Sequence, residues 1–349
     1  MRTSLQDVAR RAGVSPSAAS AALRPEPGGN VRLAEATRQR ILEAAEELGY
    51  QSNPLARGLR GQSTRTIGVL WWLGSPPSRE FMARRIARML QRRGYSTYVA
   101  DHFSSADHVV EALSNFALRG VDGVVIEAVA SVASDPRVHE ALRAFRASIV
   151  VQTTHRDAGL GADLIVQDRY TGIREAVDHL IATGRKRPLF FIARHASEGK
   201  AGVFFDQLQR HGFTAGADAA VHVDETQADN VSRLAYDALV QRHANRPDAP
   251  QFDAVLATSD ELAVGAAAWL RERGLRVPDD VAVIGFNDSH VAPFLDPPLA
   301  SVDRRDPQVV GEIESRLFQR LETPDAPRCV VSVPMRFVWR ASAGGSPPV

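Results

Sequence analysis

The sequence predicts an α/β protein in which a small all-α domain precedes a core of two lobes built on parallel sheets. Helical patterns fill the first fifty residues, and apolar, strand-like runs alternate with helical patterns over the rest of the chain. Alternating strands and helices form parallel sheets wound by right-handed crossovers. With 349 residues, 44% of them hydrophobic, the chain is long enough for two or three domains with separate cores.

The alternation falls into two series, and we expect each to form one lobe. The first series has strands at 66–72, 94–100, 121–126 and 147–151, with helices at 79–93, 107–119 and 136–146. The second series has strands at 164–166, 188–192, 220–223, 254–257 and 281–286, with helices at 171–183, 200–211, 229–242 and 261–273. A ligand cleft is expected outside the carboxyl ends of these strands.

The last part of the chain is expected to return to both lobes. A helix at 306–321 joins the first lobe, and a strand at 330–338 joins the second. The first lobe then takes about 65–162 and 293–325, and the second about 163–292 and 326–342.

The first fifty residues predict three short helices. The first has apolar residues at helical spacing, and Gly13 permits a sharp turn after it. Ser15 caps a second helix whose first residue is Pro16, where a missing N–H is tolerated. Two short helices joined in this way form a helix-turn-helix, whose second helix enters the major groove of DNA. A third helix closes a small core with Ile41, Leu42, Ala45 and Leu48.

Charge is unevenly distributed along the chain. Residues 1–65 hold ten arginines against six acidic residues, whereas the whole chain has a net charge of only +1. A basic head on a slightly acidic body is typical of nucleic-acid binding at one end.

Several classes of protein lack their sequence signatures here. Cys329 is the only cysteine, so no disulfide framework forms within the chain, and no metal or cofactor is expected. No apolar run is long enough to cross a membrane, which favours a cytoplasmic protein with no membrane partner. Nucleotide-binding and hydrolase motifs are absent, so neither catalytic residues nor an enzyme is expected. His102, His108 and His155 lack metal-ligand spacing and are expected on the solvated surface.

Three motifs in the head carry a family resemblance. Asp-Val-Ala-x-x-Ala-Gly-Val-Ser at 7–15, Ala-Ala-Glu-Glu-Leu-Gly-Tyr at 44–50 and Asn-Pro-x-Ala-Arg-x-Leu-Arg at 53–60 resemble the LacI/GalR family of bacterial transcriptional regulators. Residues 258–302 resemble the periplasmic-binding-protein-like core of the same family. The resemblance implies a helix-turn-helix DNA-binding domain at 1–51, a hinge helix at 52–61 and an effector-binding and dimerisation core at 62–349.

The resemblance also implies roles for residues of the head. The DNA-binding residues would be Ser15, Pro16, Ser17, Ser20 and Ala21 on the second helix, and Asn53, Ala56, Leu59 and Arg60 on the hinge. Leu59 matches the leucine that wedges into the minor groove. Relatives commonly carry Arg where Ala21 stands, so the operator differs from the family consensus or the readout relies more on the hinge. An eight-residue hinge helix is too short to be stable alone and should order only on DNA.

In the core, the resemblance implies an effector site made by Asp168, Lys200, Glu225, Ser259, Asp260 and Asn287. Trp72 is added to this site because it ends the first strand at the cleft. Two interpretations stay open: a pocket retuned for a ligand whose carboxylate or phosphate Lys200 holds, or a pocket that has drifted and binds no small molecule. Trp72 could stack on a sugar ring or pack at a lobe or dimer interface.

The expected function is that of a repressor that binds a near-palindromic double-stranded DNA operator as a homodimer. A small molecule, expected to be a sugar or an anionic or neutral sugar derivative, would control DNA affinity by induction or by co-repression. The alternatives are a cytoplasmic solute-binding or sugar-processing α/β protein, and a regulator that has lost its small-molecule response.

Overall fold

The computed structural model divides into two compact units, residues 1–66 and residues 67–349. Each unit is described by itself. The structure describes residues 3–23, 33–50, 63–73, 78–154, 159–193, 199–214, 216–224, 230–244, 251–304 and 306–346.

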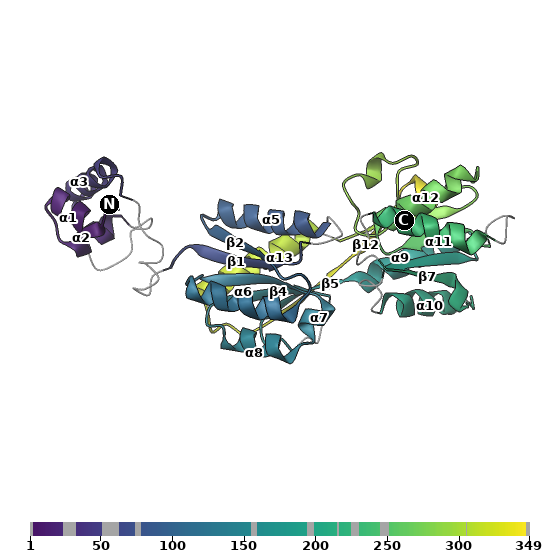
Figure 1. Ribbon diagram of the computed structural model, residues 1–349, viewed down its shortest axis with the longest axis horizontal. Coiled ribbons are helices and arrows are strands. Elements are labelled where there is room, and N and C mark those ends of the chain that lie inside the picture. The colour runs from purple at the N-terminus through teal and green to yellow at the C-terminus, as the bar shows by residue number, and fades with distance from the viewer. Residues whose placement is uncertain are drawn as a thin grey trace. The chain divides into compact units, whose positions relative to one another are not determined.

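The first unit contains α1 (Leu5–Ala12), α2 (Pro16–Ala22) and α3 (Glu35–Glu47) (Figure 1). Ser4 and Asp7 form a capping box at the start of α1, which satisfies backbone N–H groups that the helix leaves open. Gly13 ends α1 with a left-handed backbone, φ 65°, that favours glycine. The Ser15 hydroxyl then accepts from the N–H of Ala18 at 3.2 Å and caps α2. The predicted helix-turn-helix is therefore present.

The core of this unit is small and rich in alanine. Val8 and Ile41 are fully buried with Ala9, Ala19 and Ala45 around them. Small residues let the three helices approach closely, so a unit of this size still buries a continuous apolar centre. Leu42, which we expected in the core, is exposed, because it lies on the outer face of α3.

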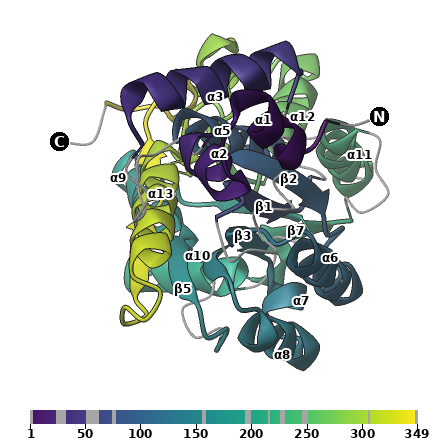
Figure 2. The same cartoon turned by 90° about the vertical axis from the view of Figure 1, so that its left-hand side faces the viewer.

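The second unit begins with a six-stranded sheet in the order β11-β5-β4-β3-β1-β2. Its strands are β1 (Thr66–Trp71), β2 (Ser96–Asp101), β3 (Gly123–Ala128), β4 (Ser148–Thr153), β5 (Asp163–Asp168) and β11 (Val330–Pro334). One face is covered by α5 (Ser78–Arg92) and α13 (Asp306–Glu322), and the other by α6 (Ala106–Leu118), α7 (Ala130–Ala133) and α8 (Pro136–Ala144) (Figure 2). Burial on both faces explains why β1 and β3 are apolar apart from Thr66 and Glu127.

A second, four-stranded sheet has the order β7-β6-β8-β9, and all its pairs are parallel. Its strands are β6 (Pro188–Ala193), β7 (Ala220–Val223), β8 (Ala254–Ala257) and β9 (Ala282–Ile284). Helices α9 (Arg169–Ala182) and α10 (Lys200–Arg210) cover one face, and α11 (Val231–His243) and α12 (Asp260–Glu272) the other. A short antiparallel pair, β10 (Ser301–Asp303) with β12 (Arg336–Val338), extends this second lobe.

The predicted lobe boundaries are wrong at three places. Residues 163–168 belong to the first lobe, because β5 pairs with β4 and Asp163 receives a bidentate ion pair from Arg320 of α13. Residues 330–334 also belong to the first lobe, because β11 pairs with β5. Residues 293–303 belong instead to the second lobe, where 300–303 run beside 284–287.

The chain crosses between the lobes at three points, and these crossovers are bonded to one another. The Met335 N–H donates to the carbonyl of Asp168 at 2.9 Å. The Gln167 side-chain amide donates to the carbonyl of Arg304 at 2.9 Å. The connections therefore form one narrow bundle between the lobes. Among the described helices, none is both long and apolar enough to span a membrane.

Candidate functional site

The predicted reading surface lies on α2. Ser15, Pro16 and Ser17 are exposed at the start of the helix, while Ser20 and Ala21 are half-buried. Ala19 and Ala22 turn inward and pack on the other two helices. This side of α2 carries small polar groups, so its backbone can approach base edges closely. The hinge residues Asn53, Ala56, Leu59 and Arg60 lie outside the described residues, and their roles stay predictions.

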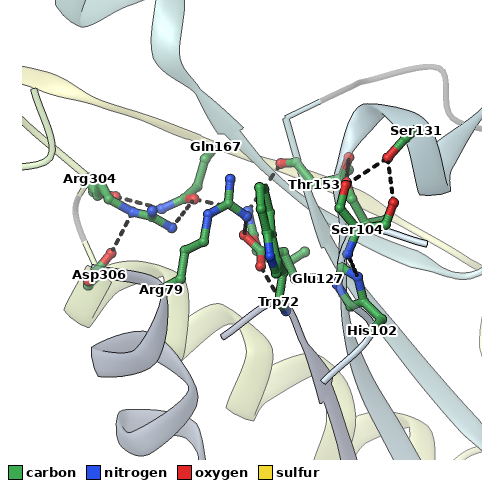
Figure 3. Close-up of polar contacts among 12 residues, drawn as sticks. Trp72, Arg79, His102, Ser104, Glu127, Ser131, Thr153, Gln167, Arg304 and Asp306 are labelled. Carbon is green, nitrogen blue, oxygen red and sulfur yellow. Dashed lines mark hydrogen bonds and ion pairs between the residues drawn. The ribbon is translucent and has the colours of Figure 1, made fainter. Parts of the chain in front are cut away.

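A buried ion pair stands at the carboxyl edge of the first sheet (Figure 3). Glu127, near the end of β3, accepts from Arg79 at the start of α5 at 2.7 Å. The same carboxylate accepts from the backbone N–H of Trp72 at 3.4 Å. The guanidinium of Arg79 lies over the Trp72 indole, 4.2 Å from the ring centroid. One face of Trp72 is thus covered by a cation in this structure.

Two polar side chains continue this edge along adjacent strands, and Arg304 of a crossover joins them. Gln152 of β4 donates to the side chain of Gln167 of β5 at 2.9 Å. Gln167 also accepts from the guanidinium of Arg304 at 3.3 Å. Glu127 is in register with Gln152, so these side chains share one face of the sheet. The Arg304 guanidinium also forms an ion pair with Asp306 at 3.4 Å, on the crossover that leads into α13.

His102 was expected on the surface, and that expectation is wrong. The imidazole is 0% exposed because the chain folds under the end of β1, where the His102 N–H bonds to the Trp71 carbonyl. Nδ1 accepts from the N–H of Ser104 at 3.1 Å, which places the ring proton on Nε2. Burial lowers the pKa of His102, so the ring is neutral near pH 7. Among the three histidines, His108 is exposed as expected, and His155 lies outside the described residues.

Asp168 ends β5 and caps the next helix. Its carboxylate accepts from the N–H of Tyr170 at 3.1 Å and from the hydroxyl of Thr171 at 2.9 Å. Arg169, the first residue of α9, is buried beside it. Both oxygens of Asp168, one of the predicted effector residues, thus already accept hydrogen bonds from the first turn of α9.

Lys200 lies in the second lobe as the first residue of α10. It is only 5% exposed, and its ammonium group lies 4.1 Å from the ring centroid of Phe286. Burial of a lysine at the positive end of a helix is unfavourable unless a partner offsets it.

Asp260 and Ser259 have structural contacts in the second lobe. The Asp260 carboxylate accepts from the Ser301 hydroxyl at 2.6 Å and from the Ser289 N–H at 2.5 Å. Burial raises the pKa of Asp260 to about 6, although these hydrogen bonds oppose the shift. Gly285 is required beside it, because a β-carbon there would lie 2.2 Å from an Asp260 oxygen. The Ser259 hydroxyl accepts from the N–H of Leu262 at 3.2 Å and caps α12.

Asn287 has a left-handed backbone, φ 94°, and is followed by Asp288 at φ 49°. The Asn287 N–H donates to the Val302 carbonyl, and Asp288 is held by an ion pair with Arg340 at 2.6 Å. Two consecutive non-glycine residues in this conformation carry backbone strain. Glu225, the remaining predicted effector residue, lies outside the described residues.

The structure thus places the predicted effector residues on the carboxyl edges of two sheets: Trp72 and Asp168 in the first lobe, and Lys200, Ser259, Asp260 and Asn287 in the second. The sequence-based search missed Arg79, Glu127, Gln152, Gln167, Arg169 and Arg304. The available signal was a basic residue at or just before the start of a helix that follows a buried strand.

A helical head with a helix-turn-helix, followed by two parallel-sheet lobes with polar carboxyl edges, defines the class of ligand-responsive DNA-binding regulators. Residues 4–53 match the model of the bacterial regulatory proteins of the lacI family, and residues 177–343 match the periplasmic binding protein-like domain.

Named relatives agree with this class over nearly the whole chain. The transcriptional regulator MalR of Streptomyces coelicolor is 30% identical over 99% of this chain and 98% of its own. The transcriptional regulator AscG of Escherichia coli is 29% identical over 93% of each chain. A lac repressor dimer bound to operator and an anti-inducer has the same fold, with a TM-score of 0.82, 20% identity and coverage of 98% of this chain and 99% of its own.

This chain belongs to the LacI family of bacterial transcriptional regulators. It has a DNA-binding domain and an effector-binding core, and its relatives are named as regulators.

Proposed function

We propose that the protein is a repressor that binds a near-palindromic operator as a homodimer and loses or gains DNA affinity when a small molecule binds at the carboxyl edges of its two lobes. The observation that carries the proposal is the pairing of a capped helix-turn-helix with a two-lobed core whose three crossovers form one bundle. A ligand that prefers one arrangement of the lobes can shift a population between two states of such a core.

Dimerisation is supported by an exposed apolar edge on the first lobe. β2 is an edge strand, and its residues Tyr98 and Val99 are 46% and 49% exposed. An uncovered edge with large apolar side chains is suited to a two-fold interface with a second copy. Two heads held by such a dimer would take two half-sites of one operator.

The effector is proposed to be a sugar or sugar derivative, held between the charged first edge and the buried Lys200 of the second. Trp72 offers an indole and Gln152 a carboxamide, which are groups that bind sugar rings and hydroxyls. Among solved structures of this fold, one is a transcriptional regulator in complex with cellobiose and another a LacI family regulator with bound ribose.

Footprinting on the promoters beside its own gene tests the core of the proposal. We expect protection of a near-palindromic segment. If no such segment were protected, the proposal of operator binding would be wrong. Turnover of a sugar or nucleotide by the pure protein would instead favour the alternative of a sugar-processing protein.

Two variants separate the roles of head and core. Leu59→Ala should weaken operator binding strongly and leave effector binding unchanged, because the minor-groove wedge is lost; equal operator affinity would refute the hinge assignment. Lys200→Ala should abolish the effector response in a folded protein. A ligand-induced melting shift that persists in this variant would count against the role of Lys200.

A further inference from the structure

Arginines gather along the amino edge of the first sheet, where the connecting segments enter its strands. This edge consists of the last turns of α5, α6, α8 and α13, the segments that lead from them into β2, β3, β4 and β11, and residues 63–65 before β1. It carries eight arginines: Arg65, Arg92, Arg93, Arg119, Arg143, Arg146, Arg320 and Arg328. Because β1, β3, β4, β5 and β11 are parallel, these segments lie on one side of the lobe.

The carboxylates of the same edge are fewer than its arginines. Arg93 pairs with Glu314 at 2.6 Å. Arg320 forms a bidentate pair with Asp163, the first residue of β5. The other carboxylates of the edge are Asp122, Glu322 and Asp325. Eight arginines thus face five carboxylates, although residues 66–349 as a whole hold 32 basic and 35 acidic residues. The excess of positive charge is therefore local to this edge.

Five of these arginines form no ion pair with a described residue, and all five are exposed: Arg92, Arg119, Arg143, Arg146 and Arg328. Glu322 and Asp325 are the carboxylates of the edge without such a pair. The guanidinium of Arg119 lies over the ring of Tyr98, 5.5 Å from its centroid. Arg143 and Arg328 both lie beside Gly161, where an added β-carbon would be 3.8 Å from Cγ of Arg143 and 2.9 Å from Nη1 of Arg328. Exposed cations that outnumber the nearby carboxylates attract a polyanion.

The ends of the helices explain part of this pattern. A cation in the last turn of a helix is stabilised by the negative end of the helix dipole, and this effect fades beyond that turn. It accounts for Arg92 and Arg143, which lie in the last turns of α5 and α8. It does not account for Arg146 or Arg328, which lie in the segments that enter β4 and β11. These two arginines call for another explanation.

The chain that leads from the head enters the core at this same edge. Residues 63–65 lie directly before β1, and the described part of the head ends at residue 50. The stretch between them spans at most about 45 Å when fully extended. DNA held by the head is thus tethered to this edge, so even a weak additional contact raises the affinity.

We propose that Arg143, Arg146 and Arg328 form a second DNA contact, which binds backbone phosphates beside the segment that the head reads. This contact rests on the proposed function, because the head must first hold the DNA. Guanidinium groups bind phosphates without regard to base sequence, and each contact releases counterions. The segments that carry these arginines enter β4 and β11, away from β2, the proposed dimer edge. Each copy therefore reaches DNA that flanks the operator.

The test is a titration of the full chain with two DNA duplexes at several salt concentrations, followed by fluorescence anisotropy. Both duplexes carry the palindrome that footprinting identifies. One ends at its borders, and the other continues for about twenty base pairs of unrelated sequence on each side, enough for two further turns of the DNA helix. We expect the longer duplex to bind about tenfold more tightly at 100 mM salt. Its salt slope should be steeper by about 0.9 for each phosphate contact, hence by about 5 for a dimer.

A triple variant and a matched control locate the contact. The edge variant carries Arg143→Gln, Arg146→Gln and Arg328→Gln. The control carries Arg187→Gln, Arg210→Gln and Arg271→Gln, at exposed positions of the second lobe. The edge variant should lose the preference for the longer duplex and bind the shorter one like the parent, whereas the control should keep the preference. Circular dichroism and size-exclusion chromatography check the fold and the oligomeric state, and Arg146→Gln alone decides the matter if the edge variant unfolds.

The proposal is overturned if the parent binds both duplexes with the same affinity and salt slope, or if the edge variant keeps the preference for the longer one. A random-sequence duplex of about sixty base pairs, six turns of the DNA helix, separates this result from the proposed function. A protected palindrome without any effect of flanking DNA removes only the second contact. A salt slope on the random duplex that falls in the edge variant, without any protected palindrome, removes the proposed function and leaves the contact standing.

Discussion

The carboxyl edges of the two sheets use buried charge in opposite ways. At the first edge, Arg79 forms a buried ion pair with Glu127 and Arg304 one with Asp306. At the second edge, Asp260 is also buried, and each of its oxygens accepts from a neighbouring serine. The first edge thus buries pairs of opposite charge, whose desolvation offsets much of their attraction, whereas the second fastens one carboxylate to its own loops.

Removal of Asp260 should give the largest effect. In Asp260→Ala, the Ser289 N–H and the Ser301 hydroxyl lose their acceptor, and the strained Asn287–Asp288 turn loses its anchor. We expect a loss of about 4 kcal/mol in the free energy of unfolding, measured in urea. The exposed Asp279→Ala is the control and should change it by less than about 0.5 kcal/mol. A loss below about 1 kcal/mol would show that the second edge is not fastened through Asp260.

Breaking the ion pair of the first edge should have the second largest effect on the free energy of unfolding. Glu127→Gln leaves Arg79 buried near other arginines and should cost about 3 kcal/mol. The double variant Arg79→Met with Glu127→Gln removes both charges and should unfold within about 1 kcal/mol of the parent. If the single and double variants lost the same unfolding free energy, the ion pair would itself stabilise the lobe. The proposed difference between the two edges would then be wrong.

The raised pKa of Asp260 at the second edge should also make the stability of the protein depend on pH. The pKa of Asp260 is about 6 in the folded protein, above the ordinary 3.8, so the carboxyl group favours folding when protonated. This contribution is complete below a pH of about 4 and is lost as the pH rises through 6. From pH 4 to 7 the parent should therefore lose about 2 kcal/mol more unfolding free energy than Asp260→Asn. If the unfolding free energies of the parent and of Asp260→Asn changed in parallel with pH, the raised pKa of Asp260 would be contradicted.

The smallest effect concerns Ser259. If its hydroxyl serves mainly to cap α12, Ser259→Ala should lower the free energy of unfolding by about 1 kcal/mol. Ser259→Asp should keep both the cap and the effector response. A response lost in the Asp variant but with unchanged stability would identify Ser259 as a ligand contact, as the family resemblance implies.

The order and type of the elements followed from the sequence, because period-2 and period-3.6 patterns are local. Which sheet a strand joins depends on residues far away in the sequence, and the wrong lobe assignments are errors of this kind. β4 and β5 are parallel neighbours joined only by residues 154–162, so the expected alternation with a long helix placed β5 in the wrong lobe.

The first edge escaped prediction for a related reason. Arg79 and Glu127 are forty-eight residues apart and meet only through the pairing of β1 with β3. In a chain with many arginines, one arginine at the start of a helix does not by itself indicate a site residue. Motifs instead drew attention to Ser259 and Asp260, whose side chains cap a helix and anchor a turn in this structure.

The bundle of three crossovers has a mechanical consequence. Because the three connecting segments are hydrogen-bonded to one another, a rotation of one lobe against the other has to move all three together. Arg304 lies on this bundle, since its carbonyl accepts from Gln167 while its guanidinium reaches the charged edge. Neutralising that guanidinium would therefore change contacts within the segment that joins the two lobes.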